Sequence, residues 1–416
     1  MKSFLPYFIF ASILFLFTCK GNQTVSKTTN IPSGDYTIAD LASSVNEFAI
    51  DLFKELGKKK ENMVFSPVSI SSALAIAYAG AKNNTAREMS YTLNFPADQS
   101  SLHAAFRDFI DSLTMASQEK GTELKIANGL WVQENYKLLP EFIELGSAYY
   151  SARIENVSFK SFEEQEKSRT KINKWVEKQT NNKIQNLIPE GILNELTRLI
   201  ITNAVYFNGN WTNPFEKNKT SPSIFHVSSS VSVKTDFMHQ KEMVWYYEDE
   251  EIQAVQLLYK GERNSMIILL PKETDDWRLV SNILTISRLD IIRNGFKREE
   301  VEIAIPRYTI ECEFGLKEIL ERLGMKEAFS NDADFSGITG HTDLTIDDVL
   351  HKAFIEVNET GTEAAAATAV IMALKSAYEE ETIRFTADHP FLYFITDLTT
   401  GSIIFMGRLV QPPDNG

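Results

Sequence analysis

The chain has 416 residues, and 56 acidic residues against 42 Lys and Arg give it a formal net charge of −14. At ~150 residues per domain, this length predicts two or three domains or one unusually large one. The acidic balance argues against a duplex-binding surface, which requires clustered Lys and Arg. The two cysteines, Cys19 and Cys312, are too few for a disulfide-rich scaffold or a cysteine-based zinc site.

Residues 1–18 are predicted to be a signal peptide. Lys2 supplies the positive start, and the apolar run Phe8–Phe17 is too short to cross a bilayer comfortably. The run leads to Leu-Phe-Thr-Cys19, which resembles the lipidation site of bacterial lipoproteins, so Cys19 is the predicted lipidated residue. A plain signal peptide that contains a cysteine is the alternative. We therefore expect an exported protein, either a lipoprotein of the cell envelope or a protein of the extracellular space.

Residues 19–36 are polar and rich in Thr, Ser, Gly and Pro, which predicts a flexible tether after the lipidated end. No second linker follows, so residues 37–416 are expected to form a single domain. Apolar periodicity predicts helices at 39–56 and 69–81, and a charge-laced helix at 162–183. Runs rich in β-branched and aromatic residues predict strands at 199–207, 253–258, 266–270, 301–310, 391–396 and 403–405. Helices first and strands mainly later favour an α+β fold.

The motifs of common enzymes do not occur in this sequence. None of the six histidines forms an H-x-x-x-H pair, and the sequence has no G-x-S-x-G elbow, P-loop or dinucleotide-binding glycine motif. Cys312 has no neighbour that would activate a thiol, so it is expected to be a spare thiol. We expect no enzyme activity, no metal and no cofactor.

The segment 351–411 is the most informative part of the chain. A strand-like run at 353–357 leads to Glu359, Gly361 and Thr362, and then to four consecutive alanines. Helix propensity favours a helix with Thr362 as its N-cap. Every second residue from Thr362 to Leu374 is uncharged and increasingly apolar, which instead fits a strand buried in a sheet. The segment is therefore compatible with a loop, a helix or a central strand.

Glu359 and the residues from Gly361 to Thr368 resemble the proximal hinge of the reactive-centre loop of inhibitory serpins. Further resemblances to this family follow the same chain order: 62–74 to its N-P-V-S-I helix opening, 202–211 to a central strand that ends in tryptophan, and 387–391 and 405–408 to its C-terminal strands. The chain is therefore identified as a member of the serpin family over about residues 37–411. This membership implies an α+β fold with three β-sheets, eight or nine helices and an exposed loop near the C-terminus.

The resemblance also implies an activity. A serine protease attacks the loop and forms an acyl-enzyme, and the cut loop then enters the central sheet and carries the protease with it. The residues that match the hinge are mostly small, as insertion beneath a sheet requires: Glu359, Gly361, Thr362, Glu363, Ala364, Ala365, Ala366 and Ala367. Non-inhibitory serpins tend to have bulky or charged side chains here. We expect an inhibitor, and a non-inhibitory binding scaffold is the alternative.

The family spacing of sixteen residues from Glu359 places the reactive bond at Lys375–Ser376. A long cationic side chain before the bond suits a trypsin-like protease, whose pocket has a carboxylate at its base. With a loop one residue shorter, the reactive bond would be Leu374–Lys375, which suits a chymotrypsin-like protease. Ala373 before the bond would suit an elastase-like protease. Papain-like proteases are a further class of target. The expected partner is thus a protease, with no nucleic acid and no membrane contact except through the lipid, and the protein is expected to be a monomer.

Two clusters of residues carry over from the family by position. Four residues match the shutter, a buried polar network that controls opening of the central sheet: Ser66, Ser69, Asn203 and His351. Trp211 and Arg307 match the breach, where the loop first enters, and Arg307 is expected to pair with Glu359 even though lysine is common at its position. The short run Lys58–Lys60 is expected to be a solvated helix end rather than a heparin-type site.

Overall fold

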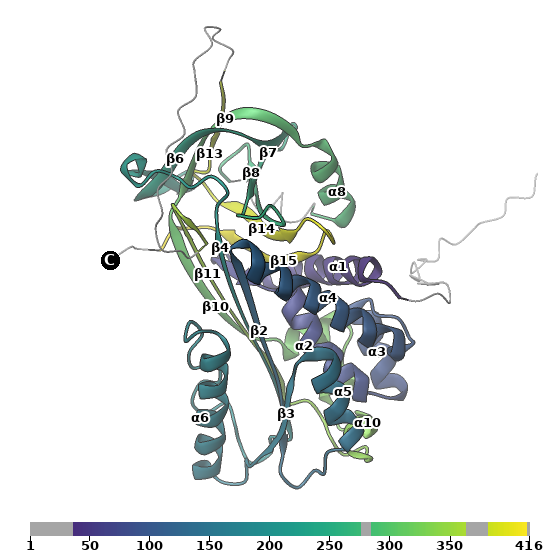
Figure 1. Ribbon diagram of the computed structural model, residues 1–416. Helices are drawn as coiled ribbons and strands as arrows, with labels where there is room; N and C mark the ends of the chain where they lie inside the picture. Colours follow the sequence, from purple (N-terminus) through teal and green to yellow (C-terminus); the bar gives the residue numbers. More distant parts are fainter. Residues whose placement is uncertain (1–35, 276–283, 363–381, 414–416) are drawn as a thin grey trace, which may run out of the picture. The chain divides into compact units, whose positions relative to one another are not determined.

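The computed structural model describes residues 36–275, 284–362 and 382–413 (Figure 1). Residues Asp35–Gly416 form one compact unit. Within the described ranges, no helix combines the length and the apolar character that crossing a membrane requires.

Most of the helices precede the main strands in the chain, as the sequence predicts. The described residues contain α1 (Ile38–Leu56), α2 (Pro67–Gly80), α3 (Asn83–Leu93), α4 (Gln99–Lys120), α5 (Pro140–Tyr150), α6 (Phe162–Gln179), α8 (Ile286–Gly295), α9 (Lys317–Leu323), α10 (Ser336–Thr339) and the short 3-10 turns η1 (Lys217–Lys219) and η2 (Glu327–Phe329). Thr37 and Asp40 form a capping box that starts α1. Every residue of α2 is buried, which explains its nearly unbroken apolar sequence.

A six-stranded sheet contains the segment that resembles the hinge. Its order is β10 (Tyr308–Gly315), β11 (Asp348–Asn358), β12 (Gly361–Thr362), β4 (Leu199–Asn210), β2 (Thr122–Gln133) and β3 (Arg153–Val157). β11 and β4 also pair directly with each other, in parallel, whereas β10 with β11 and β2 with β4 are antiparallel. The short strand β12 lies between β11 and β4 and is antiparallel to both.

The second sheet has nine strands. Its order is β1 (Met63–Phe65), β15 (Ile403–Leu409), β14 (Phe391–Asp397), β8 (Asn264–Pro271), β7 (Ile252–Leu258), β6 (Val231–Glu248), β9 (Lys297–Pro306) and β13 (Ile383–Thr386), with β5 (Ser221–Ser228) paired to β6. The long strand β6 joins two parts: it pairs with β5 and β9 over most of its length and with β7 only at its end. The second and third sheets that the family resemblance implies are therefore continuous through β6.

The six-stranded sheet is covered on both faces (Figure 1). α6 lies on one face, where Ile172 and Val176 pack with Ile200 of β4 in a small separate core. On the other face, α2 and α4 contribute to the main core, together with Leu199 and Ile201 of β4. Successive residues of β4 thus point to opposite sides, as strand geometry requires. A strand entering beside β4 would be covered on both faces.

Two sequence predictions need correction, and two strands were missed. The strand predicted at 301–310 is two strands, β9 and β10, which belong to different sheets and meet at Arg307. Pro306 ends β9 because proline has no N–H for the ladder. The helix predicted to reach Lys183 ends at Gln179. β2 and β6 were not predicted, because charged and polar residues interrupt the apolar run in each strand.

Candidate functional site

The candidate site is the seam between β4 and β11. Over Ile200–Tyr206 and Asp348–Phe354 the two strands are direct neighbours. Beyond these residues the strands no longer pair, and Gly361 and Thr362 fill the space between them. Gly361 is opposite Asn210 on one side and Asn358 on the other. Gly361 and Thr362, two of the residues that match the hinge, therefore occupy the open end of the seam.

Glycine is the only residue type that position 361 accommodates. The φ of Gly361 is +154°, a backbone conformation that residues other than glycine rarely adopt. A Cβ added here would also lie 2.0 Å from the carbonyl oxygen of Gly209 and 2.6 Å from Cα of Asn210. Both obstacles are backbone atoms of β4, so they cannot move aside as a side chain would. The glycine allows the chain to turn into the seam at close range.

Thr362 is completely buried, and its side chain is fixed by Tyr259. The two hydroxyl oxygens are 2.7 Å apart. The Tyr259 ring stacks on Trp211, with ring centroids 4.6 Å apart and an interplanar angle of 15°. Burial raises the pKa of Tyr259 far above its usual range, so the phenol keeps its proton. A small hydroxyl residue is thus accepted here, and a large charged one would have no room and no ionic partner.

Trp211 and Phe215 hold the backbone just before the hinge. The indole Nε1 of Trp211 donates to the carbonyl of Asn358 at 3.0 Å, and its backbone N–H donates to the carbonyl of Thr360 at 2.9 Å. The backbone N–H of Phe215 donates to the carbonyl of Glu359 at 2.8 Å. The segment after β4 therefore binds three successive carbonyls of the chain that leads into the loop. Trp211, which matches the breach by position, thus contacts the chain directly before Gly361.

The side chain of Glu359 is almost completely buried between two partners. Thr220 Oγ1 donates to its carboxylate at 2.8 Å, and the guanidinium of Arg307 lies 3.6 Å from the same oxygen. Arg307 pairs more closely with Asp236, at 3.0 Å. The expected pairing of Arg307 with Glu359 is therefore present, but Arg307 divides its charge between two carboxylates. The break between β9 and β10 is what brings Arg307 to this position.

The four residues that match the shutter are completely buried and connected across the closed part of the seam. Asn203 on β4 and His351 on β11 are register partners, and the distance from His351 Nδ1 to Asn203 Oδ1 is 2.5 Å. The amide of Asn203 donates to Ser69 Oγ and to Asn128 Oδ1, both at 2.6 Å. The Ser66 side chain accepts the backbone N–H of Ser69 at the start of α2. The network thus links β4, β11, β2 and α2.

The hydrogen bonds of His351 determine its tautomer. Because Asn203 Oδ1 only accepts, Nδ1 of His351 carries the proton, and Nε2 accepts the backbone N–H of Ser66 at 3.2 Å. Burial lowers the pKa of His351 to about 3, so the ring is neutral near pH 7. Protonation of Nε2 would replace the bond to Ser66 by a repulsive contact between two donors. The neutral ring is therefore part of what holds the seam closed.

Several predicted site residues lie outside the described residues. They are Cys19, Glu363, Ala364, Ala365, Ala366, Ala367, Lys375 and Ser376. The choice between loop, helix and strand for the segment after Thr362 falls there as well. Cys312 is described: its Sγ lies 3.8 Å from the carbonyl of Asn62, and burial raises the pKa of the thiol, as expected of an unreactive cysteine. No group of three or more potential metal ligands occurs within the described ranges.

Three residues that take part in the site were missed from the sequence. Tyr259 binds Thr362, Thr220 binds Glu359, and Asn128 extends the network of Asn203. Asn128 lies in β2, which was not predicted, and Thr220 lies outside any strand or helix. Tyr259 follows a predicted strand and precedes Lys260-Gly261, a pattern typical of an exposed turn. No local signal marks these residues, because each contributes through a contact distant in the chain.

Comparisons with known proteins agree with this architecture. Residues 43–412 match the family described as "Serpin (serine protease inhibitor)". The chain is 40% identical to an uncharacterized serpin-like protein of Thermococcus kodakarensis, covering 90% of this chain and 86% of the relative. It is 37% identical to the human leukocyte elastase inhibitor, covering 89% and 99%. The crystal structure of human thyroxine-binding globulin complexed with thyroxine is similar, with a TM-score of 0.82 and 28% identity; 90% of this chain and 99% of the other chain are covered. The chain belongs to the serpin family.

Proposed function

We propose that this protein inhibits serine proteases by conformational trapping. A protease cuts a bond in the loop that follows Thr362, and it remains attached to the cut loop as an acyl-enzyme. The freed segment then extends β12 into the seam between β4 and β11. The attached protease is carried along the sheet, and its active site is distorted before water can release it.

One observation carries this proposal: the hinge already occupies the open end of the seam. β12 pairs with Val357 and Asn358 on one side and with Gly209 and Asn210 on the other. Its direction is antiparallel to both strands, whereas β4 and β11 are parallel to each other. Continued insertion would replace a parallel pairing by two antiparallel ones, which are slightly more stable per residue. On the proposed mechanism, the pairing of β12 with both strands would be the first step of insertion.

The free-energy change of full insertion is large. About thirteen inserted residues, at ~0.5–1.5 kcal/mol net per hydrogen bond, contribute on the order of 10 kcal/mol before any side chain is buried. This is comparable with the ~5–15 kcal/mol that stabilises a whole domain. At ~3.3 Å per residue, the attached protease would move roughly 40 Å. The uncut form is then a kinetic trap, and cutting releases it.

The proposed reactive bond is Lys375–Ser376, and the proposed target is a trypsin-like protease. The cationic side chain of Lys375 would enter a pocket with a carboxylate at its base. The acidic residues 379–381 on the far side of the bond disfavour proteases with acidic rims. The relative named leukocyte elastase inhibitor supports a serine protease as the target class. Because this relative is named for elastase, inhibition of elastase has to be compared with inhibition of trypsin.

The test is to mix the purified protein with trypsin, chymotrypsin, elastase and papain in separate reactions. The proposal predicts that trypsin and the inhibitor form an SDS-resistant band at the sum of their two masses. Mass spectrometry should show that the released C-terminal peptide begins at Ser376. A covalent band that forms only with another protease would move the reactive bond to Leu374 or Ala373. Cleavage by every protease without any covalent band would instead identify a non-inhibitory scaffold.

We propose in addition that the inhibitor is exported and is anchored by a lipid on Cys19. A lipid chain contributes ~0.8 kcal/mol per buried CH₂, so acylation of Cys19 would retain the protein at a membrane surface. The variant Cys19→Ala should leave the membrane fraction and inhibit a soluble protease as well as the unchanged protein does. Unchanged partitioning of Cys19→Ala, or a mature N-terminus without lipid mass, would contradict the anchor and leave a secreted inhibitor.

A further inference from the structure

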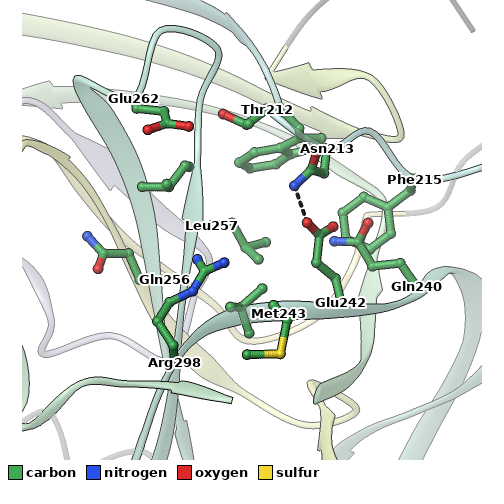
Figure 2. Close-up of a pocket in the computed structure, with 13 residues that line it drawn as sticks. Thr212, Asn213, Phe215, Gln240, Glu242, Met243, Gln256, Leu257, Glu262 and Arg298 are labelled. Carbon is green, nitrogen blue, oxygen red and sulfur yellow. Dashed lines mark hydrogen bonds between the residues drawn. The ribbon is translucent and has the colours of Figure 1, made fainter. Parts of the chain in front are cut away.

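The two ends of the β4–β11 seam are packed differently. Beside the open end, a cavity of about 90 Å³ lies behind Trp211 and Phe215, and Figure 2 shows the side chains that line it. At the far end, where β4 and β11 begin, the strands are held together by a residue outside the hinge, the breach and the shutter. This residue is Asp347, which directly precedes β11.

Asp347 forms three hydrogen bonds with the start of β4. Its carboxylate oxygen Oδ2 accepts the backbone N–H of Arg198 at 2.5 Å and that of Leu199 at 2.9 Å. Its own backbone N–H donates to the carbonyl of Leu199 at 2.9 Å. Burial raises the pKa of the Asp347 carboxyl, and the two N–H groups offset part of that rise, so they stabilise the charged form. We call these three residues the Asp347 clasp.

The clasp joins the two halves of the six-stranded sheet. On one side, the carbonyl of Arg198 accepts the backbone N–H of Gln133, which fixes the start of β4 to β2. On the other side, β11 pairs with β10 over Leu350–Val357. Neighbouring strands lie about 4.8 Å apart, so a strand that enters the seam would separate β4 and β11 to roughly 10 Å. The short side chain of Asp347 cannot span that distance, and its bonds to β4 would break.

The register of β12 gives the point at which insertion would reach the clasp. Thr362 is opposite Gly209 on β4 and Val357 on β11, and β12 is antiparallel to both strands. Each further inserted residue therefore advances by one position along each strand. Leu199 lies ten positions before Gly209, and Asp347 lies ten positions before Val357. Counted along either strand, the tenth residue after Thr362 would pass between the partners of the clasp.

The shutter and the clasp would thus be successive obstacles. The sixth inserted residue would separate Asn203 from His351, which lie six positions before the same two partners of Thr362. The proposed reactive bond follows Lys375, which is the thirteenth residue. Insertion that stopped at the clasp would leave the last four residues outside the sheet. At ~3.3 Å per residue, the attached protease would then stop roughly 13 Å short.

We propose that Asp347 is a positioning residue for inhibition: it holds the far end of the seam closed and has to release β4 before the last four residues of the cut loop insert. This inference rests on the proposed inhibitory function, because the clasp opens only if a strand enters the seam. The uncut sheet is then held closed at two places. A cut loop opens the shutter first and the clasp last, and the last part of the protease's movement depends on the clasp.

The next residue in the chain is a matched control. Asp348 also accepts two backbone N–H groups, those of Val349 at 2.7 Å and of Lys317 at 3.2 Å. Burial raises the pKa of its carboxyl, as it does for Asp347. Val349 belongs to β11 and Lys317 begins α9, directly after β10. Both donors therefore lie on the β10–β11 side of the seam, and a strand that enters beside β4 leaves these bonds intact.

The test compares guanidinium denaturation of the uncut and the cut protein for the unchanged chain, Asp347→Ala and Asp348→Ala. The cut forms are made by limited proteolysis near Lys375. Asp347→Ala should lower the midpoint of the uncut form by about 0.3 M or more, because charge-assisted hydrogen bonds are lost. It should leave the midpoint of the cut form unchanged, because insertion has already broken those bonds. Asp348→Ala should lower both midpoints by similar amounts, as expected of a residue that only supports the fold.

Equal losses in the uncut and the cut form of Asp347→Ala would overturn the proposal, as would an unchanged midpoint in its uncut form. If Asp347→Ala does not fold, Asp347→Asn keeps the shape of the side chain and one acceptor oxygen, and it should show a smaller loss in the uncut form alone. Equal midpoints of the uncut and the cut unchanged protein would contradict insertion itself, and the role of the clasp with it. That failure is recognised without any variant, so the two failures are distinguishable.

Discussion

The two ends of the β4–β11 seam differ in how they are held together. In the closed part, Asn203 and His351 are opposite each other and join the strands through side chains that are completely buried. At the open end, the strands are separated by Gly361 and Thr362, and no direct β4–β11 pairing remains. If the loop inserts as proposed, insertion would start at the open end and would break the bond between Asn203 and His351 as it proceeds. On this proposal, the residues at the open end determine whether insertion begins, and the buried network determines its barrier.

The largest expected effect is at the hinge. Thr362→Arg would place a cation at a fully buried position beside Tyr259, where an unpaired charge costs several kcal/mol. The loop should still be cut, but the covalent complex should be lost, so the variant becomes a substrate. The number of inhibitor molecules consumed per protease measures this. Thr386→Arg, on an exposed position of β13, is the control, and normal inhibition by Thr362→Arg would contradict the role of the hinge.

The next effect is at the closed part of the seam. Asn203→Ala leaves the ring N–H of His351 and the side-chain oxygen Oδ1 of Asn128 without their partner. This loss should lower the free energy of unfolding by roughly 2–4 kcal/mol. The uncut variant should also lose activity faster on warming, because the loop can insert without being cut. Chemical denaturation and residual inhibition after incubation measure the two effects. Asn208→Ala, on the same strand but outside this network, should change both far less.

The resemblance to serpins located the residues of the closed part better than those of the open end. Ser66, Ser69, Asn203 and His351 are brought together although His351 and Asn203 are 148 positions apart. Composition and periodicity contain no information about such a contact, and only the matched motifs indicated it. Tyr259 was missed because its contact with Thr362 depends on how two separate sheets meet.

Local patterns predicted several elements well and missed others. The apolar α2 and the strands β7, β8 and β14 were found within a few residues of their observed ends. β6 was missed because much of one side of it faces solvent, and its polar residues hide the alternation. The strand predicted at 301–310 was too long because the apolar residues on either side of Pro306 and Arg307 were assigned to one strand, although the proline marks the end of β9.

Acid should weaken the closed part selectively. The unfolded chain takes up a proton on His351 below pH ~6.5, whereas the folded protein does so only near its lowered pKa of about 3. Stability from this group is therefore complete above pH ~6.5 and decreases by up to ~1.4 kcal/mol per pH unit as the pH falls toward 3. Urea denaturation between pH 7 and 5 should show a shallower pH dependence in His351→Gln. An identical dependence in both proteins would contradict the assignment.

The smallest expected effect is at Arg307. Its side chain is 39% exposed and divides its charge between Asp236 and Glu359, so Arg307→Ala should change the free energy of unfolding by about 1 kcal/mol or less. The rate of complex formation with trypsin should increase slightly, because Glu359 loses one of the contacts that hold the hinge. Arg322→Ala, which removes an ion pair with Glu55 far from the seam, is the control. A loss of several kcal/mol would show that the breach depends on Arg307 much more than the geometry indicates.

The most direct test of loop insertion is the melting temperature of the protein before and after its loop is cut. A protease that nicks the chain near Lys375 leaves every described strand intact and leaves a segment long enough to extend β12 along the seam. If the segment inserts, the cut protein gains on the order of 10 kcal/mol and should melt about 10 °C or more above the uncut one. A cut protein that melts at the same temperature as the uncut one would contradict insertion and with it the proposed inhibitory mechanism.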